Sequence, residues 1–425
     1  MKLDLSGPSR MPPGSLDPAS LAQRRALVEL LHAAGHLHSP RVAAALAAVP
    51  RELFVPGLDL QEVYRPAEAI VTKRVDGVGV SSASAPNVVA LMLEQLDPRP
   101  GQRVLEIGAG TGYNAALLAC LVGPSGHVAT LDIDEDLVAA AKQHLHAAGF
   151  DRVEVLTQDG ALGHPAAGSV FDRIMLTVAS RDIAPAWREQ LACPGGRLVL
   201  PLAIRGLQRS TAFEPADGHL VSTSLQACHF IPLRGLLAAS TLRVPLGPDG
   251  ALSIALPDEA APLPVEAFQT FFSQAKYIWP SGVSASLDEV RDGLHLWLVA
   301  HDPSVYSVWA EPGVRLIPDL FGIAERVRAS LCAVDAQGVA LLGWAGEGRH
   351  AGELCVTAPL AGGAVAAHLV ELLRAWAMAG RPRDSQVQIR AYACDDAEAP
   401  SAAADEVVIP QRWTRFVLRW VARPS

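Results

Sequence analysis

A short apolar run leads into closely spaced glycines at Val104-Leu105-Glu106-Ile107-Gly108-Ala109-Gly110-Thr111-Gly112-Tyr113. We expect residues 103–107 to form a buried strand and residues 113–122 to form a helix, because glycine permits a sharp turn between them. A strand, glycine loop and helix in this order bring the backbone close to a ligand. The sequence therefore predicts a cofactor loop at residues 108–112.

The flanking segments continue this alternation of strands and helices. Further strands are expected at residues 127–132, 153–156, 171–177 and 197–201, and further helices at residues 21–36, 40–48, 84–96 and 135–148. Strands that alternate with helices at this spacing indicate a parallel, doubly wound sheet. The predicted fold class is therefore α/β, with a Rossmann-like domain at residues 19–235 after a flexible lead-in at residues 1–18.

The character of the chain changes after about Gly235. Seven of the eight tryptophans lie beyond it, which suggests that this part was shaped by different constraints. We expect strands at residues 293–301, 338–346, 387–393 and 415–420, a helix at residues 364–379 and a loop at residues 395–405. These elements predict a smaller α+β domain at residues 236–425.

The spacing of the glycines argues against a dinucleotide. A dinucleotide loop has the pattern GxGxxG, whereas here the third glycine comes one residue early and Tyr113 follows it. Glu106 suits a cation, such as the amine or sulfonium of S-adenosylmethionine, better than a pyrophosphate. We therefore predict S-adenosyl-L-methionine as the cofactor and expect no bound metal.

Two acidic positions after later strands fit the same cofactor. Asp132 ends the next strand, where its carboxylate can accept hydrogen bonds from ribose hydroxyls. Asp159-Gly160 follows the third strand, where adenine would lie, although Asp159 would serve equally as a helix cap. The predicted cofactor-binding residues are Glu106, Gly108, Gly110, Thr111, Gly112, Asp132, Asp159 and Gly160.

Composition narrows the partners and the location. The net charge of −9 disfavours a dedicated nucleic-acid binder, because such proteins carry basic surfaces. The six cysteines form no CxxC pair, and no stretch of about 18 apolar residues could span a membrane. We expect a cytoplasmic protein that binds neither nucleic acid nor membrane, and the sequence leaves its oligomeric state open.

Four segments resemble the protein-L-isoaspartate O-methyltransferase family. They are Val49-Pro50-Arg51-Glu52-Leu53-Phe54-Val55-Pro56, Ser84-Ala85-Pro86, the glycine loop with its helix up to Ala119, and Pro185 to Pro201. The resemblance covers roughly residues 20–235 and implies a class I methyltransferase that esterifies an aspartyl or isoaspartyl carboxylate of a peptide or protein. It also implies that Ser84 is the active-site residue, although Ser84 alone would also be read as a helix N-cap.

Carboxyl methylation explains why no catalytic base is evident. A carboxylic acid with a pKa near 4 is already an anionic nucleophile at neutral pH. The enzyme has only to align its oxygen with the methyl group and exclude water. A hydroxyl such as that of Ser84 can orient the carboxylate by donating a hydrogen bond.

The lead-in to Ser84, residues 71–83, departs from the family pattern because it is longer and lacks a glutamine. Lys73 and Arg74 in it are predicted to meet a substrate carboxylate, although a solvated loop fits them as well. Ser82 and Thr177 are further predicted substrate contacts.

The extended layout is similar to that of family members that accompany ribosomally made peptides such as lanthipeptides, lasso peptides and graspetides. That resemblance implies methylation of an aspartyl side chain in a constrained peptide, followed by aspartimide formation. The alternatives are repair of isoaspartyl residues in damaged proteins and a non-catalytic peptide-binding adaptor. A nucleic-acid methyltransferase is disfavoured because the strand end Leu176-Thr177-Val178 lacks an Asn/Asp-Pro-Pro-Tyr motif.

Overall fold

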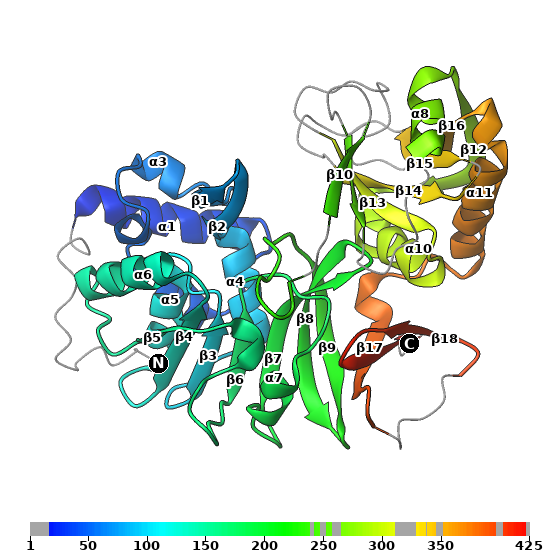
Figure 1. Cartoon of the computed structure of the whole chain (residues 1–425). Coiled ribbons are helices and arrows are strands. Elements are labelled where there is room, and N and C mark those ends of the chain that lie inside the picture. Colours follow the sequence, from blue (N-terminus) through cyan, green and yellow to red (C-terminus); the bar gives the residue numbers. More distant parts are fainter. Residues whose placement is uncertain are drawn as a thin grey trace.

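The computed structural model describes residues 17–238, 242–246, 252–256, 265–310, 329–336, 338–345, 352–396 and 403–421. A ten-stranded sheet, a seven-stranded sheet and a two-stranded hairpin, with the helices around them, make up these residues (Figure 1). No helix among them combines the length and the apolar character needed to cross a membrane.

Five parallel strands form the centre of the larger sheet. Side by side they lie in the order β7 (Arg197–Ile204), β6 (Arg173–Leu176), β3 (Arg103–Ile107), β4 (His127–Asp132) and β5 (Glu154–Thr157). The connecting helices are α5 (Tyr113–Val122), α6 (Glu135–Ala147), η3 (Gly160–Leu162) and α7 (Pro185–Glu189). Two antiparallel strands, β8 (Leu207–Ala216) and β9 (His219–Ala227), extend the sheet beyond β7.

The central strands are apolar along their length because both faces of the sheet are covered. In β3, Leu105 and Ile107 join one core cluster while Val104 joins the other. Successive side chains of a strand point to opposite faces, so a strand buried on both sides has a continuous apolar run. This pattern made β3, α5 and β4 predictable to the residue.

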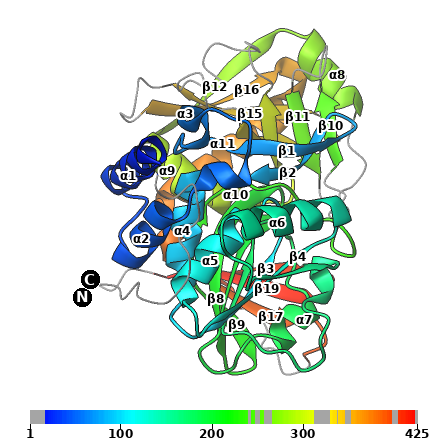
Figure 2. The same cartoon turned by 90° about the vertical axis from the view of Figure 1, so that its left-hand side faces the viewer.

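The N-terminal elements cover one face of this sheet and supply a hairpin (Figure 2). They are α1 (Pro18–Ala33), α2 (Pro40–Ala48), η2 (Arg51–Phe54), α3 (Leu60–Val63), β1 (Ile70–Val75), β2 (Val78–Ala83) and α4 (Pro86–Leu96). The N-cap of α4 is Ala85, and no side chain caps this helix. The reading of Ser84 as an N-cap is therefore wrong, because Pro86 takes the first helical position and places the cap one residue later.

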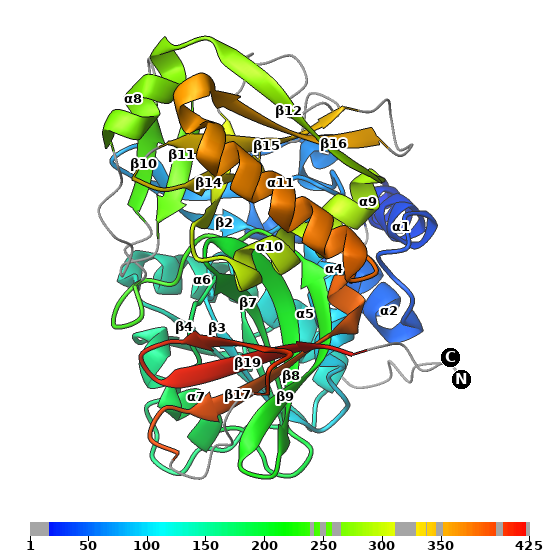
Figure 3. The ribbon, with the colours of Figure 1, turned by 90° about the vertical axis from the view of Figure 1, so that its right-hand side faces the viewer.

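The second sheet has seven strands and is entirely antiparallel. Its strands, in their spatial order, are β10 (Leu242–Leu246), β11 (Leu252–Leu256), β13 (Val305–Ala310), β14 (Ala329–Val334), β15 (Val339–Ala345), β16 (Gly352–Pro359) and β12 (Lys276–Ala285). The accompanying helices are α8 (Val265–Ser273), α9 (Leu287–Glu289), α10 (His295–His301), η6 (Leu360–Gly362) and α11 (Gly363–Met378), which lies across the sheet (Figure 3).

One predicted strand of this region is a helix. Residues 293–301, expected to be extended, belong to the π-helical turn η5 (Val290–Leu294) and to α10. Leu296, Leu298 and Val299 are all fully buried, and residues 296–300 form an unbroken apolar run. Such a run does not distinguish a buried strand from a buried helix.

The last strands return to the first sheet. After η7 (Asp384–Gln386), β17 (Val387–Ala393) pairs with β9, and β19 (Thr414–Trp420) and β18 (Glu406–Pro410) continue the sheet to ten strands. Figure 3 shows β17 and β19, which extend the sheet beyond β9. The predicted fold class is confirmed, but strand pairing crosses the expected boundary at residue 235, so that division into domains stays a prediction.

Candidate active site

The glycine loop lies where the strand order of the sheet reverses. Strand β3 has β4 on one side and β6 on the other, and ligands of doubly wound sheets bind beyond the carboxyl ends of such strands. The backbone N–H groups of Gly108 and Ala109 both donate to the carbonyl oxygen of Leu131, at 2.8 Å. These bonds tie the start of the loop to the end of β4.

The backbone of the loop requires glycine. Gly108, Gly110 and Gly112 have φ angles of 103°, 51° and 87°, which L side chains rarely adopt. A Cβ atom at Gly108 would also come within 2.5 Å of the hydroxyl oxygen of Thr177. At Gly110 it would point toward Ser81 and Ser82, the nearest atoms being 3.8 Å away. The loop therefore presents bare backbone toward the neighbouring hairpin.

Two adjoining pockets open beside this loop. The outer pocket is lined by Val80, Ser81, Ser82, Ile107, Gly108, Gly110, Leu131, Asp132, Ile133, Gln158, Gly160, Thr177, Val178, Ile231, Pro232, Leu233 and Arg234. The inner pocket is lined by Ser82, Ala83, Ser84, Val89, Met92, Glu106, Gly108, Ala109, Gly110, Thr111, Tyr113, Asn114, Met175, Thr177 and Phe230. They share Ser82, Gly108, Gly110 and Thr177, so one elongated ligand can occupy both.

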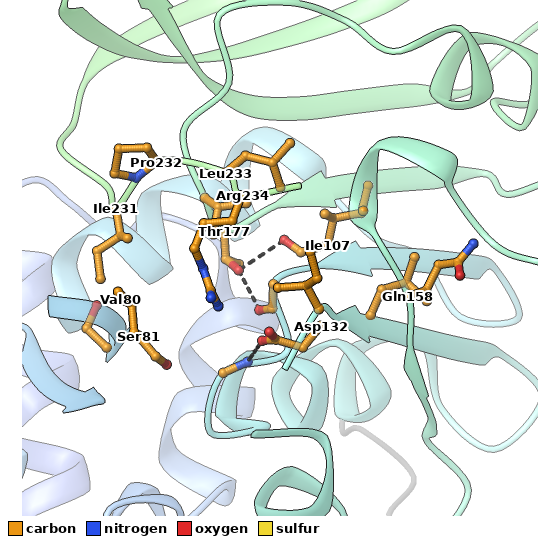
Figure 4. A pocket seen from close by; sticks show the side chains of 17 residues that line it. Val80, Ser81, Ile107, Asp132, Gln158, Thr177, Ile231, Pro232, Leu233 and Arg234 are labelled. Carbon is orange, nitrogen blue, oxygen red and sulfur yellow. Dashed lines mark hydrogen bonds between the residues drawn. The ribbon is translucent and has the colours of Figure 1, made fainter. Parts of the chain in front are cut away.

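Asp132 is the acidic side chain of the outer pocket (Figure 4). One of its carboxylate oxygens accepts a hydrogen bond from the backbone N–H of Gly110 at 2.9 Å, and the other accepts one from Asp134 at 3.3 Å. Burial raises the pKa of Asp132. The carboxylate is thus fixed beside the loop, in the position predicted for a ribose-binding residue.

Asp159 is engaged elsewhere. One oxygen of its carboxylate accepts from the N–H of Ala161 and caps η3, and the other accepts from the N–H of Leu236 at 2.8 Å. Gln158 and Gly160 line the outer pocket, but Asp159 does not. The structure thus gives Asp159 the cap role, and the adenine contact predicted for it stays a prediction.

Glu106 is the acidic side chain of the inner pocket and is completely buried. It accepts hydrogen bonds from the hydroxyl of Thr130 at 2.6 Å and from the amide of Asn114 at 2.7 Å. Burial raises its pKa to about 7. The amide oxygen of Asn114 has no hydrogen-bond partner among the described residues.

These groups fit S-adenosylmethionine. The glycine loop permits close approach, Asp132 can accept from ribose hydroxyls, and Glu106 with the unpartnered oxygen of Asn114 favours a cation in the inner pocket. Thr111 lines the same pocket, and its carbonyl accepts from the ring of His144 at 3.0 Å.

The stability of the unliganded chain is expected to fall as Glu106 ionises. A carboxyl with a higher pKa in the folded chain holds its proton more tightly there, so its contribution favours folding at low pH and is lost as the pH rises from 4.5 to about 7. A shift of this size corresponds to about 3 kcal/mol. Urea unfolding below and above this window should show Glu106→Gln gaining on the wild type by about that amount. An equal difference at both pH values would contradict the assignment.

Ser84 lines the inner pocket, and the active-site role that the resemblance implies for it stays a prediction. Its carbonyl oxygen accepts from the guanidinium of Arg51 at 2.9 Å, and its hydroxyl makes no hydrogen bond with another described residue. Ser82 lines both pockets. Thr177 also lines both, but its hydroxyl donates to the carbonyl oxygen of Gly108 at 2.6 Å and so holds the loop.

The side chains of Lys73 and Arg74 are not among those that line the two pockets. The ammonium of Lys73 lies 2.7 Å from a carboxylate oxygen of Asp134 and from one of Asp136. Arg74 donates to the carbonyl oxygen of Gly77 within its own hairpin. The structure thus ties Lys73 to the start of α6, and the substrate contacts predicted for both residues stay predictions.

Sequence reasoning missed residues 231–234, which line the outer pocket together with Val80 and Ser81 of β2 (Figure 4). The guanidinium of Arg234 makes two hydrogen bonds to Asp134, at 3.0 and 2.8 Å. Asp134 thus pairs with Lys73 of the β1–β2 hairpin and with Arg234 of this segment, and it links the two. Asn114 and Gln158 were also missed. No local pattern marks these residues, because their partners are distant in sequence.

The matching family model and the relatives in sequence share one description. The model of the family described as Protein-L-isoaspartate(D-aspartate) O-methyltransferase (PCMT) matches residues 22–238. A protein-L-isoaspartate O-methyltransferase of Methanopyrus kandleri is 41% identical over 214 residues, which is 50% of this chain and 91% of the relative. One from Hyperthermus butylicus is 39% identical over 221 residues, covering 50% and 88%.

Two solved structures align with this chain at lower similarity. A protein-L-isoaspartate O-methyltransferase aligns with 86% of this chain and 96% of its own, at 21% identity and a TM-score of 0.49. A putative one from Plasmodium falciparum, in complex with S-adenosyl-L-homocysteine, covers 50% of this chain and 98% of its own, at 19% identity and a TM-score of 0.44.

Proposed function

Because the chain belongs to the protein-L-isoaspartate(D-aspartate) O-methyltransferase family, we propose that this S-adenosylmethionine-dependent enzyme methylates an aspartyl side chain in a constrained ribosomal peptide. The observation that carries the carboxyl chemistry is the hydroxyl of Ser84, which lies in the inner pocket without a partner among the described residues. The proposed substrates of the enzyme are therefore peptides or proteins that carry an aspartyl or isoaspartyl carboxylate. A cytoplasmic location stays a prediction.

Methylation of a carboxylate requires no proton transfer by the protein. S-adenosylmethionine supplies a methyl group that leaves its sulfur with the bonding electrons staying on sulfur, so a carboxylate oxygen can accept the methyl group without any proton being moved. The chain contributes orientation: Ser84 donates a hydrogen bond to the carboxylate, and the apolar side chains of Met92 and Phe230 exclude water from the inner pocket.

Aspartimide follows from the ester without further help. The next backbone nitrogen of the substrate attacks the ester carbonyl, its proton passes to the departing methoxide, and methanol leaves. A constrained peptide favours this step when it holds that nitrogen close to the ester, because proximity converts the attack into an intramolecular one.

Two features support a substrate other than ordinary damaged protein. The hairpin that leads to Ser84 is fixed by Lys73 to α6, in a lead-in that departs from the family pattern. The second sheet also reaches the edge of the site: the ring of Trp309 on β13 lies 4.6 Å from that of His229, and the next residue, Phe230, lines the inner pocket. We therefore assign substrate recognition to residues 236–425.

The alternative is repair of L-isoaspartyl residues. The relatives named above carry the name of that activity, and it fits the family equally.

A comparison of three short peptides separates the two functions. They share one sequence and contain an isoaspartyl residue, an aspartyl residue, or an aspartyl residue in a lactam-cyclised ring. Mass spectrometry follows gain of a methyl ester and then loss of water relative to the starting peptide. We expect the full chain to prefer the cyclised aspartyl peptide. Efficient methylation of the isoaspartyl peptide, with the aspartyl ones ignored, would establish repair instead.

The same experiment with Trp309→Ala tests the role of the second sheet. We expect the preference among the peptides to shrink, while affinity for S-adenosylhomocysteine stays at the wild-type value. A preference that survives unchanged would remove Trp309 from substrate recognition.

A further inference from the structure

Arg51 is a buried cation whose side chain donates hydrogen bonds to backbone carbonyl oxygens, two of them beside the inner pocket. Its side chain is completely buried. Its Nε donates to the carbonyl oxygen of Val63 at 3.0 Å, and its Nη2 donates to the carbonyl oxygens of Ser84 at 2.9 Å and Ala83 at 3.3 Å. The guanidinium carbon also lies 4.9 Å from the centre of the Tyr113 ring.

The neighbouring carboxylate is already engaged. Glu52 accepts hydrogen bonds from the hydroxyls of Ser20 and Tyr64 and lies 3.7 Å from the guanidinium of Arg24. Arg51 is instead stabilised by carbonyl dipoles and by the face of an aromatic ring. Its Nη1 and the hydroxyl of Tyr113 have no hydrogen-bond partner among the described residues.

Burying a charge without a carboxylate costs free energy, so a purely structural role would be better served by an apolar side chain. What distinguishes Arg51 is the set of atoms it joins. Ser84 and Tyr113, which directly follows the glycine loop, both line the inner pocket. Helix α4, which follows Ser84, lacks a side-chain cap.

We propose that Arg51 is a positioning residue: its fork fixes the backbone of Ser84 against the cofactor loop, so that the hydroxyl of Ser84 points at the reacting carboxylate. The inference rests on the proposed function of Ser84. Lysine would keep the charge but has no planar fork, so it cannot hold Val63 and Ser84 in the same geometry.

The test compares Arg51→Lys with Arg173→Lys. Arg173 is a matched control because it is buried and donates to the carbonyl oxygens of Leu96, Asp172 and Gly195, but it lies at the amino end of β6, whereas the pockets lie at the carboxyl ends of the strands. Each variant is measured for kcat with whichever of the three peptides the wild type methylates, for affinity for S-adenosylhomocysteine, and for thermal unfolding.

We expect Arg51→Lys to lower kcat by about 10²-fold, the cost of misplacing a reacting group by roughly 1 Å. Its affinity for S-adenosylhomocysteine should stay close to wild type, and Arg173→Lys should change only thermal stability. Equal kcat values in the two variants, measured where both are folded, would overturn the proposal. Methylguanidinium added to Arg51→Ala should restore part of its rate.

A double variant separates this inference from the proposed function. If Arg51 acts through Ser84, adding Arg51→Lys to Ser84→Ala should cost nothing further. A wild-type rate in Ser84→Ala would overturn both the role of Ser84 and this inference. A slow Ser84→Ala with an unimpaired Arg51→Lys would overturn the inference alone.

Discussion

Replacing Asp132 with alanine is expected to abolish binding of S-adenosylhomocysteine while the chain stays folded. Asp132 is the carboxylate of the outer pocket, and it also accepts the N–H of Gly110. Hydrogen bonds to a charged group contribute about 1.5–3 kcal/mol each. Losing two ribose bonds and the tie to the loop should therefore weaken binding by at least about 10²-fold. Titration calorimetry measures the loss directly.

Asp151→Ala is the matched control for this variant. Asp151 is exposed, pairs with His146, and precedes the amino end of β5, whereas Asp132 lies at the carboxyl end of β4. It should bind as the wild type does, and both variants should unfold cooperatively. If Asp132→Ala bound S-adenosylhomocysteine normally, the outer pocket would not be the cofactor site.

The parts of the fold that could be predicted are those fixed by local pattern. The bounds of β3, α5 and β4 follow from an apolar run, three glycines and a second apolar run, all close in sequence. Residues 293–301 could not be assigned, because a fully buried helix and a fully buried strand are equally apolar. The pairing of β17 with β9 joins residues far apart in the chain, and no local signal specifies such a partner.

The site divides in the same way. Ser84, Glu106, Gly110 and Asp132 all line the two pockets, and they were predicted from the glycine loop, from a strand end and, for Ser84, from the family resemblance. Arg234 and Lys73 are both held by ion pairs with Asp134, a residue that is distant from both in the sequence. From the sequence, a charged side chain can be predicted to contact a substrate. Only the fold shows that it already pairs with a carboxylate elsewhere in the chain.

This topology also changes how the role of residues 236–425 can be tested. A chain cut at Gly235 would lose β17, β18 and β19 and leave β9 as an exposed edge. Exposed edges promote aggregation, so loss of activity in that fragment would say little about substrate recognition. Single substitutions in the full chain, such as the one at Trp309, avoid this difficulty.

Ser84→Ala is expected to lower kcat by about 10²-fold, the typical loss when one preorganised hydrogen-bond donor is removed. The cofactor pockets are otherwise untouched, because the bond that holds residue 84 in place uses its backbone carbonyl and not its hydroxyl. Affinity for S-adenosylhomocysteine should therefore remain at the wild-type value. The measurement is single-turnover methylation of the preferred peptide together with calorimetric binding.

Two further variants serve as controls for Ser84→Ala. Ser84→Thr keeps a hydroxyl and should recover much of the rate, whereas a residue needed only for its small size would not allow it. Ser125→Ala removes an exposed hydroxyl in the turn before β4, at the amino end of the strands and away from the pockets, and should behave as the wild type. Because Ser84 does not cap α4, lost helix stability cannot account for a slow Ser84→Ala enzyme. A wild-type rate in Ser84→Ala would mean that the carboxylate is oriented by some other donor of the inner pocket.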